Sequence, residues 1–322
     1  MEIAHERLRE MLRLMYSIRG FELKAQELYK EGLAQGEFLG ALHSYEGQEA
    51  VAVGACACVG RDDYLVSSHR GHGHCIAKGA DMKLMMAELL GKETGISRGH
   101  GGSMHMFSPE RGLLGGNGIV GGGTPLALGA AFTAQYRETE QVALCFFGEG
   151  AATQGVSHES LGLASLWKLP VIYICENNLW AATTPISDSW PVADLVARAE
   201  SFGCPAQVVD GNDMLAVHKV VREAVRRARE GKGPTLIEAK TYRHRPHCMV
   251  IPEHREEEEL AEWHRRDPIP RLERHLLERE VMTEAEMQEV KDAVDEELVE
   301  AAAFARESAL PEPSTFADCL WA

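Results

Sequence analysis

Short apolar runs alternate with longer amphipathic segments along most of the chain. Four short, mostly apolar runs predict buried strands of a parallel sheet: 64–66, 142–147, 171–175 and 234–239. A further strand with a turn is expected at 206–213. Apolar positions at helical spacing predict the intervening helices: 51–59, 82–90, 125–136, 158–168, 193–202 and 214–230. The pattern predicts an α/β fold with a mostly parallel sheet flanked by helices.

Both ends of the chain have helical patterns instead. Residues 5–33 place apolar side chains at intervals of about 3.6 residues, and residues 256–309 do the same with two prolines as interruptions. We therefore expect a helical N-terminal arm over about residues 1–40 and a helical C-terminal region over about residues 254–322. The sequence contains no internal repeat and no low-complexity linker, which favours a single domain over residues 1–322.

A stretch in the middle of the chain carries the clearest candidate chemistry. It predicts a strand, a glycine turn, a helix and a second strand, so both strands end at the sheet edge where such folds bind ligands. Glu149 follows the first strand inside Gly148-Glu149-Gly150, and Asn177-Asn178 follow the second. Carboxylate and amide oxygens suit Mg²⁺ or Ca²⁺, and a glycine turn before a helix suits phosphate. The unit predicts a metal–diphosphate site.

Two predicted strands open onto cationic turns. The first strand is followed by Arg70 and by histidines at positions 69, 72 and 74, and the last strand by basic residues within 240–248. In an acidic protein such local positive patches suit an anionic ligand. A metal site made by His69, His72 and His74 is disfavoured, because no predicted helix aligns them and no cysteine accompanies them.

Two glycine-rich loops lie between these features, at 99–106 and 115–123. Loops of this length contain more glycine than turns require, so close approach of the backbone to a cofactor explains them better. The second loop leads into the predicted helix at 125–136, which is rich in small residues. Such a helix is typical of close packing against another helix, including one of a partner chain.

Composition and charge narrow the class of protein. The chain has 322 residues, a formal net charge of −16 and a pI near 5.4, which argues against nucleic acids and anionic membranes as partners. No apolar run reaches the roughly 18 residues of a membrane span, and the acidic N-terminus has no signal-peptide core. The eight cysteines lack metal or redox spacing, so we expect a reducing, cytoplasmic location.

The central unit resembles the thiamine diphosphate motif, which begins Gly-Asp-Gly and ends Asn-Asn. Twenty-six residues separate Gly150 from Asn177, within the family's range, and Glu149 replaces the usual Asp. Further motifs follow in the family's order: Gly47-Gln48-Glu49-Ala50, His69-Arg70-Gly71-His72-Gly73, Gly102-Ser103-Met104-His105, 115–121, Thr241-Tyr242-Arg243 and Arg266-Asp267-Pro268-Ile269. Together they resemble the alpha subunit of the thiamine diphosphate-dependent first component of 2-oxoacid dehydrogenase complexes. That family contains the pyruvate, branched-chain 2-oxoacid and acetoin dehydrogenases.

This resemblance implies the thiamine diphosphate-binding fold and assigns roles to individual residues. The implied Mg²⁺ ligands are Glu149, Asn178 and the backbone carbonyl of Trp180. The implied diphosphate contacts are Arg70, His247 and His69, which stands where the family has a Tyr. The implied backbone contacts to the cofactor are Gly118, Val120, Gly148, Gly150 and Ala151. The implied catalytic residues are His43, His72 and His247, with His43 and His72 near the reactive carbon.

The resemblance also implies a reaction and partners. Thiamine diphosphate would cleave acetoin or decarboxylate a 2-oxoacid, and the acyl group would pass to lipoamide on a lipoyl-bearing acyltransferase component. The glutamate that activates the aminopyrimidine ring comes from a separate beta subunit in this family, so an α2β2 heterotetramer is implied. The pattern of residues 243–247 resembles that of acetoin dehydrogenase alpha subunits most closely. Acetoin or pyruvate is therefore favoured, with a branched-chain 2-oxoacid as the alternative.

Three other functions were considered. The cofactor half of a split transketolase is disfavoured, because residues 151–154 lack the acidic and leucine residues that follow its motif. A non-catalytic family member that lost tight metal binding through Glu149 is disfavoured by the retention of Arg70, His72 and His247. A nicotinamide dinucleotide enzyme would need Gly-x-Gly-x-x-Gly after its first strand and a ribose-binding acid downstream, and the sequence has neither.

Overall fold

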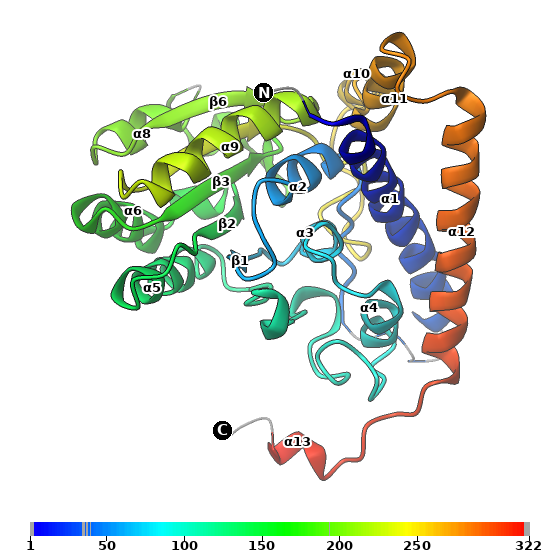
Figure 1. Cartoon of the computed structure of the whole chain (residues 1–322). Helices are drawn as coiled ribbons and strands as arrows, with labels where there is room; N and C mark the ends of the chain where they lie inside the picture. Colours follow the sequence, from blue (N-terminus) through cyan, green and yellow to red (C-terminus); the bar gives the residue numbers. More distant parts are fainter. Residues whose placement is uncertain (1–2, 34–35, 37, 39, 193, 319–322) are drawn as a thin grey trace.

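A five-stranded parallel sheet forms the centre of the molecule (Figure 1). The computed structural model describes residues 3–33, 36, 38, 40–192 and 194–318. Within this part the strand order is β1-β2-β3-β7-β6, and every neighbouring pair is parallel. The strands are β1 (Tyr64–Val66), β2 (Ala143–Gly148), β3 (Val171–Asn177), β6 (Ala206–Asp210) and β7 (Thr235–Lys240). The predicted α/β fold with a mostly parallel sheet is confirmed.

Alternate side chains of each strand enter different hydrophobic cores on the two faces of the sheet. On β2, Leu144 and Phe146 belong to one core, whereas Cys145 and Phe147 belong to the other. The first core includes α1 (His5–Leu33), α2 (Glu49–Cys56) and α9 (Met214–Arg229). The second core includes α5 (Gly123–Tyr136), α6 (Gly155–Trp167) and α8 (Val196–Glu200). Because helices cover both faces, the central strands β2 and β3 are apolar over most of their length, which explains their apolar runs.

The helical ends of the chain lie together beside the sheet (Figure 1). α1 packs along α12 (Glu284–Glu307), which also contacts α4 (Met82–Leu89). The helical pattern predicted for 256–309 forms three helices, of which the first two are α10 (Glu257–Arg265) and α11 (Pro268–Glu278). Their boundaries follow local chemistry: Asp267 caps α11 just before Pro268, and a capping box of Thr283 with Glu286 begins α12. A short helix, α13 (Thr315–Asp318), follows, and residues 319–322 lie outside the described residues.

Some predicted helices differ from the observed ones in extent. The helix expected at 51–59 ends at Cys56, and the helix expected at 158–168 already begins at Gly155. The helix expected at 193–202 is α8, and Ala193 lies outside the described residues. The expectation that no helix aligns the histidines after β1 is wrong, because α3 (His72–Ala77) contains two of them. The buried side chains of α3 are partly polar, so hydrophobic periodicity does not reveal this helix.

Short elements complete the described chain around the carboxyl edge of the sheet. They are η1 (Gly102–Met104), η2 (Pro109–Arg111), η3 (Ala151–Thr153), β4 (Trp180–Ala181), β5 (Thr184–Pro185) and α7 (Ile186–Ser189). The antiparallel β4–β5 pair directly follows Asn178, so the chain reverses just beyond the predicted metal ligand. Gly150 lies close beneath this pair, because a Cβ at that position would come within 2.8 Å of the Ala181 Cβ.

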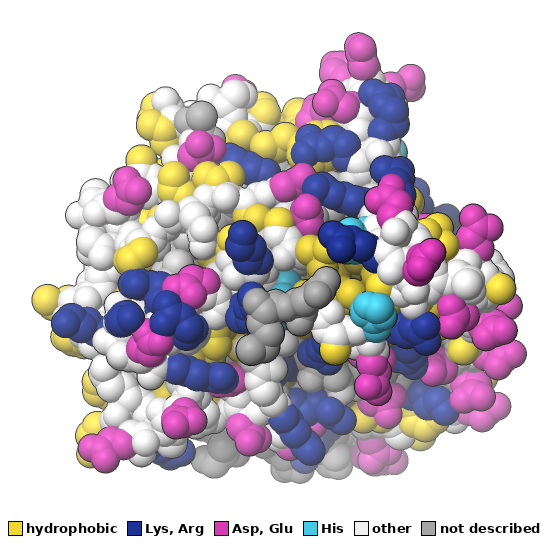
Figure 2. Space-filling model, turned by 45° about the horizontal axis from the view of Figure 1, so that its top comes forward, with side chains coloured by type: hydrophobic (Ala, Val, Ile, Leu, Met, Phe, Trp, Pro, Cys, Tyr) yellow, Lys and Arg dark blue, Asp and Glu magenta, His cyan; other side chains and the backbone are white. Residues whose placement is uncertain are grey.

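The surface carries the acidic excess of the sequence. Figure 2 shows acidic side chains gathered along the edge where α12 runs in Figure 1. The exposed acidic residues of α12 are Glu284, Glu289, Asp292, Asp295, Glu296, Glu300 and Glu307. Among the helices that the structure describes, none combines the length and the apolar character needed to cross a membrane.

Candidate functional site

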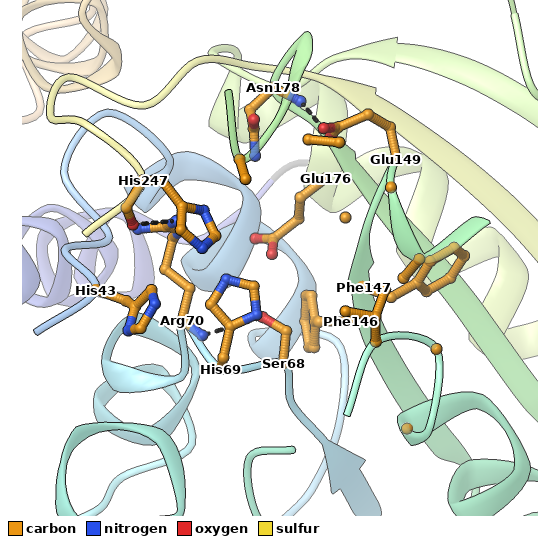
Figure 3. A pocket seen from close by; sticks show the side chains of 18 of the residues that line it. His43, Ser68, His69, Arg70, Phe146, Phe147, Glu149, Glu176, Asn178 and His247 are labelled. Atoms are coloured by element: carbon orange, nitrogen blue, oxygen red, sulfur yellow. Dashed lines mark hydrogen bonds between the residues drawn. The ribbon is translucent and has the colours of Figure 1, made fainter. Parts of the chain in front are cut away.

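A cavity of about 490 Å³ opens at the carboxyl ends of the central strands (Figure 3). Parallel strands place these ends at one edge, where α/β folds bind their ligands. The lining includes all the predicted site residues except His72, namely His43, His69, Arg70, Gly118, Val120, Gly148, Glu149, Gly150, Ala151, Asn178, Trp180 and His247. The structure thus gathers residues from widely separated parts of the sequence into one site.

The oxygens of the three predicted metal ligands lie in one hydrogen-bonded group at the ends of β2 and β3. The Glu149 Oε2 accepts the backbone N–H of Asn178 at 3.2 Å. The guanidinium group of Arg243 donates to the Asn178 Oδ1 at 3.1 Å and to the Trp180 carbonyl at 3.1 Å. A cationic group therefore already lies against two of the three oxygens, so this group of oxygens is suited to holding positive charge.

The two adjacent asparagines have different surroundings. The side chain of Asn177 is fully buried and donates to the Glu238 Oε1 of β7 at 2.6 Å. Asn178 instead lines the cavity, and its Nδ2 donates to the Gln48 Oε1 at 3.2 Å. Consecutive side chains at a strand end point in opposite directions, which separates the two amides. Asn178 is therefore the amide available to a ligand in the cavity.

Buried charges and unpaired donors surround these oxygens. Burial raises the pKa of Glu149, and burial followed by the neighbouring charges of Arg70 and Arg255 lowers the pKa of Arg243 to about 9. The Nη1 of Arg243 and the Nε2 of Gln48 are buried and have no hydrogen-bond partner among the described residues. A buried donor without an acceptor is costly, so an anionic ligand would be stabilised here.

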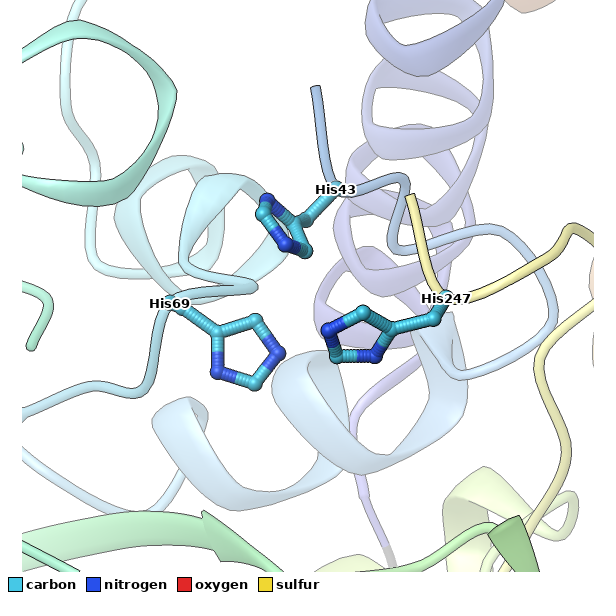
Figure 4. Close-up of side chains that lie close together, drawn as sticks. All are labelled: His43, His69 and His247. Carbon is cyan, nitrogen blue, oxygen red and sulfur yellow. The ribbon is translucent and has the colours of Figure 1, made fainter. Parts of the chain in front are cut away.

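Three histidines line the same cavity and lie against one another (Figure 4). The ring centroids of His43 and His69 are 4.8 Å apart, and those of His43 and His247 are 5.0 Å apart. Burial, then the charge of Arg70, lowers the pKa of His43 to about 3 and that of His247 to about 4. The same two causes lower the pKa of His69 well below its usual range. All three imidazoles are therefore neutral at neutral pH.

Arg70 is anchored next to these histidines by backbone carbonyl groups. Its Nη1 donates to the Ser44 carbonyl at 2.6 Å and its Nη2 to the His247 carbonyl at 2.9 Å. The guanidinium is buried, and burial lowers its pKa to about 10. Arg70 thus joins two of the segments that form the cavity and brings a positive charge to it.

His72, which was predicted to line the active site, is not among the residues that line the cavity. Its ring is fully buried, with Nδ1 2.9 Å from the Glu22 Oε1 and Nε2 3.1 Å from the Ser103 Oγ. It also packs edge-on against Phe21, with ring centroids 5.4 Å apart. At the start of α3 the side chain faces α1 and η1, so His72 holds these elements together instead of contacting a ligand in the cavity.

The loop before α5 forms the exposed rim of the cavity. Gly118 and Val120, both predicted to contact the cofactor, lie in its lining. Ile119 is 75 % exposed and Val120 is 55 % exposed, which is unusual for large apolar side chains on one loop. The Asn117 Oδ1 accepts the backbone N–H of Ile119 at 2.8 Å and holds the loop in this shape. Exposed apolar groups beside a ligand cavity are typical of a protein–protein contact.

The lining residues that were not predicted as site residues include the polar side chains of Gln48, Glu176 and Arg243. The signals were present in the sequence, because Gln48 and Arg243 belong to recognised motifs and Glu176 precedes the asparagine pair. Figure 3 shows the Glu176 carboxylate directed into the cavity. Its Oε1 accepts the Tyr45 hydroxyl and lies 3.1 Å from the His74 Nε2. This buried network fixes the carboxylate beneath the histidine cluster.

Comparisons with known proteins identify the family of this chain. Residues 13–314 match the family described as dehydrogenase E1 component. The chain is 42 % identical over 317 residues to the alpha subunit of acetoin:2,6-dichlorophenolindophenol oxidoreductase of Bacillus subtilis. The matched region covers 98 % of this chain and 93 % of that protein. It is 41 % identical over 304 residues to the pyruvate dehydrogenase E1 component subunit alpha of Porphyra purpurea, covering 92 % and 87 % of the two chains. The corresponding subunit of Zymomonas mobilis is 44 % identical over 310 residues, covering 95 % and 86 %. The chain therefore belongs to the dehydrogenase E1 component family.

Proposed function

We propose that this chain is the alpha subunit of a thiamine diphosphate-dependent dehydrogenase that binds its cofactor through Mg²⁺ and acts on acetoin or pyruvate. One observation carries the proposal. Oxygens of Glu149, Asn178 and Trp180 gather in a cavity whose buried donors, Arg243 Nη1 and Gln48 Nε2, lack partners among the described residues. Ligands for a hard cation and donors for an anion in one cavity suit a metal–diphosphate group.

The metal would be held by the Glu149 carboxylate, the Asn178 amide oxygen and the Trp180 carbonyl. Mg²⁺ takes few protein ligands and completes its coordination with phosphate oxygens and water. The raised pKa of Glu149 comes from burial, and a cation at its oxygens would offset that effect. Arg243 donates to the other two oxygens and keeps its Nη1 for a phosphate oxygen.

The chain itself orients the cofactor and handles protons. When bound, thiamine diphosphate supplies the carbanion chemistry that cleaves the bond beside the substrate carbonyl. The His43 Nδ1 lies 3.1 Å from the Ala41 carbonyl, which can only accept, so Nδ1 carries the proton and Nε2 keeps its lone pair. Since burial keeps this ring neutral, the His43 Nε2 can accept a hydrogen bond from a group in the cavity. The His247 ring is also neutral and lines the same cavity.

A partner subunit would complete the site. Among the described lining residues the acidic side chains are Glu149, which is a proposed metal ligand, and Glu176, which is held by Tyr45 and His74. Neither is placed as an additional carboxylate for the aminopyrimidine ring, so we infer that a beta subunit supplies it. The exposed apolar loop around Ile119 gives that subunit a surface beside the cavity. We propose an α2β2 assembly that passes the acyl group to a lipoyl-bearing acyltransferase.

The substrate proposal rests on the names of relatives and on the sequence pattern at 243–247. The similar Bacillus subtilis protein is named for acetoin, and the Porphyra purpurea and Zymomonas mobilis proteins for pyruvate. A branched-chain 2-oxoacid is the alternative substrate. We further propose that residues 1–322 form a single domain and that the protein is cytoplasmic, a location based on its scattered cysteines.

A two-stage experiment tests the proposal. Thiamine diphosphate is titrated by calorimetry into the chain copurified with its beta-type partner, with Mg²⁺ and with a chelator. Binding that requires Mg²⁺ supports the cofactor site, and its absence in a folded complex favours a non-catalytic family member. Acetoin, pyruvate and branched-chain 2-oxoacids are then compared as substrates with 2,6-dichlorophenolindophenol as the electron acceptor, and the highest kcat/KM identifies the substrate.

A further inference from the structure

Imidazoles from three distant parts of the sequence meet in the cofactor cavity. His43 precedes α2, His69 follows β1 and His247 follows β7. One ring nitrogen from each residue can be chosen so that all three lie within 4.8 Å of one another. Figure 4 shows the rings approaching a common space from separate backbone segments. His72 and His74 are close to His69 in the sequence but do not belong to this group. Both are buried, His72 beside Glu22 and His74 beside Glu176.

We propose that His43, His69 and His247 form a binding site for a transition-metal ion of the Zn²⁺ class. Imidazole nitrogens suit Zn²⁺, Co²⁺ and Ni²⁺, whereas Mg²⁺ prefers oxygen ligands such as those around Glu149. Three protein ligands leave a fourth tetrahedral position for water or another ligand. The proposed site is therefore chemically distinct from the Mg²⁺ site, although both lie in one cavity.

A backbone hydrogen bond orients one of the three rings. The Ala41 carbonyl accepts from the His43 Nδ1 at 3.1 Å, which leaves the lone pair of that ring on Nε2. A carbonyl group that accepts from the other ring nitrogen also holds metal-binding histidines in place in known metal sites.

The separation of the rings sets the expected affinity. A tetrahedral ion with metal–nitrogen distances of about 2.1 Å needs ligand nitrogens roughly 3.4 Å apart. The observed limit of 4.8 Å is larger, so the side chains must close on the ion through small torsional changes. Because this closure opposes binding, we expect a dissociation constant on the order of 1 μM, weaker than in structural zinc sites.

Charges around the cluster are mixed. The Arg70 guanidinium opposes a cation, but it donates to the carbonyls of Ser44 and His247, which offset part of its charge. Glu149 and Glu176 line the same cavity, and their negative charges act on Arg70. Two carboxylates thus balance the positive groups of the lining, and the local charge does not exclude a divalent ion.

Binding at this site would compete with the proposed cofactor. This consequence, unlike metal binding itself, rests on the proposed function, in which His69 and His247 contact the diphosphate. An imidazole nitrogen that ligates a metal cannot also donate to phosphate. A Zn²⁺-class ion would therefore keep the enzyme from loading thiamine diphosphate.

Co²⁺ titration tests the site directly, because tetrahedral Co²⁺ absorbs visible light strongly. The full chain, free of any histidine tag and copurified with its partner, is titrated with Co²⁺ in the absence of Mg²⁺ and thiamine diphosphate. We expect one Co²⁺ per chain with a tetrahedral spectrum, displaced by Zn²⁺. His69→Gln and His43→Gln should each weaken binding at least about 100-fold. His158→Gln, which changes a histidine outside this cavity, should leave the affinity unchanged.

The outcomes separate the metal site from the proposed function. An unchanged affinity in folded His69→Gln, or no tetrahedral spectrum in the parent, overturns the metal site, and circular dichroism confirms folding. If His43→Gln does not fold, His247→Gln replaces it. Thiamine diphosphate is then titrated with Mg²⁺, with and without Zn²⁺. An apparent Kd that rises with Zn²⁺ supports competition, and a constant Kd overturns it. If the chain binds thiamine diphosphate but no metal ion at the histidines, the metal site is overturned and the proposed function stands.

Discussion

Replacing Arg243 with Lys removes the planar donor group of the cofactor cavity but keeps a positive charge. In the structure the guanidinium spans the oxygens of two proposed metal ligands, with Nε 3.1 Å from the Asn178 Oδ1 and Nη2 3.1 Å from the Trp180 carbonyl. Its buried Nη1 has no partner in the described chain and is the donor proposed for a phosphate oxygen. A single ammonium group cannot hold both oxygens and a phosphate together, so Arg243→Lys should weaken thiamine diphosphate binding.

The size of the effect follows from the contacts that are lost. A hydrogen bond to a charged group contributes about 1.5–3 kcal/mol, so losing the bond from Nη1 to phosphate should raise Kd roughly 10- to 150-fold. The bonds to Asn178 and Trp180 act instead through the position of the metal ligands. Their loss should weaken Mg²⁺ binding, which a higher Mg²⁺ concentration can overcome. Part of the defect should therefore disappear at saturating Mg²⁺, and the phosphate part should remain.

Calorimetric titration at several Mg²⁺ concentrations measures both parts. Arg229→Lys is the matched control, because Arg229 makes an ion pair with Asp63 at 2.7 Å and does not line the cavity. Thermal unfolding establishes that both variants are folded. A folded Arg243→Lys complex with the parent Kd at saturating Mg²⁺ would refute the assignment of Nη1 to the diphosphate.

Three further predictions concern the metal ligands and the partner surface. Asn178→Ala should abolish Mg²⁺-dependent thiamine diphosphate binding, and normal calorimetric affinity in that variant would contradict the site. In Glu149→Gln, thiamine diphosphate binding should no longer be strengthened by Mg²⁺, whereas in Glu149→Asp, which keeps a carboxylate, it should be. Equal behaviour of the two variants would show that the carboxylate at position 149 is not a metal ligand. Ile119→Asp should weaken association with the beta-type partner at least about tenfold by placing a charge on an apolar contact, measured by analytical ultracentrifugation, with Glu289→Gln on α12 as the control.

The positions of the strands and major helices along the chain were predictable, because burial on both faces makes the central strands β2 and β3 apolar over most of their length. Helix boundaries were less accurate, since they depend on caps such as Thr283 with Glu286, which the periodic pattern does not show. The short helix α3 was missed for a different reason. His72 and His74 are buried in it by tertiary hydrogen bonds to Glu22 and to Ser67, at 2.9 Å and 2.7 Å. A polar helix held in this way has no hydrophobic periodicity to detect.

The residues proposed to bind the cofactor lie in short motifs, and the fold brings almost all of them to one cavity. Motifs do not show which way a side chain points, so His72 was placed at the active site although it faces α1. Motifs also do not show which hydrogen-bond donors remain unpaired after folding. The buried, unpaired Nη1 of Arg243 was therefore not predicted. The meeting of His43, His69 and His247 depends on the path of three separate segments, so spacing in the sequence gives no sign of it.

The electrostatics of the cavity link the two proposed cofactor components. Burial opposes the charged forms of Arg70 and Arg243, whose pKa values fall to about 10 and about 9, and also that of Glu149, whose pKa rises. A diphosphate would compensate the two arginines but repel Glu149, and Mg²⁺ would compensate Glu149 but repel the arginines. Each component therefore removes the repulsion that the other creates, so Mg²⁺ and diphosphate should bind cooperatively. A ligand that binds only the folded chain also stabilises it, by about 2.7 kcal/mol at a ligand concentration of about 100 times Kd. Because each component lowers the Kd of the other, a fixed concentration of thiamine diphosphate should stabilise the chain more when Mg²⁺ is present than when it is absent.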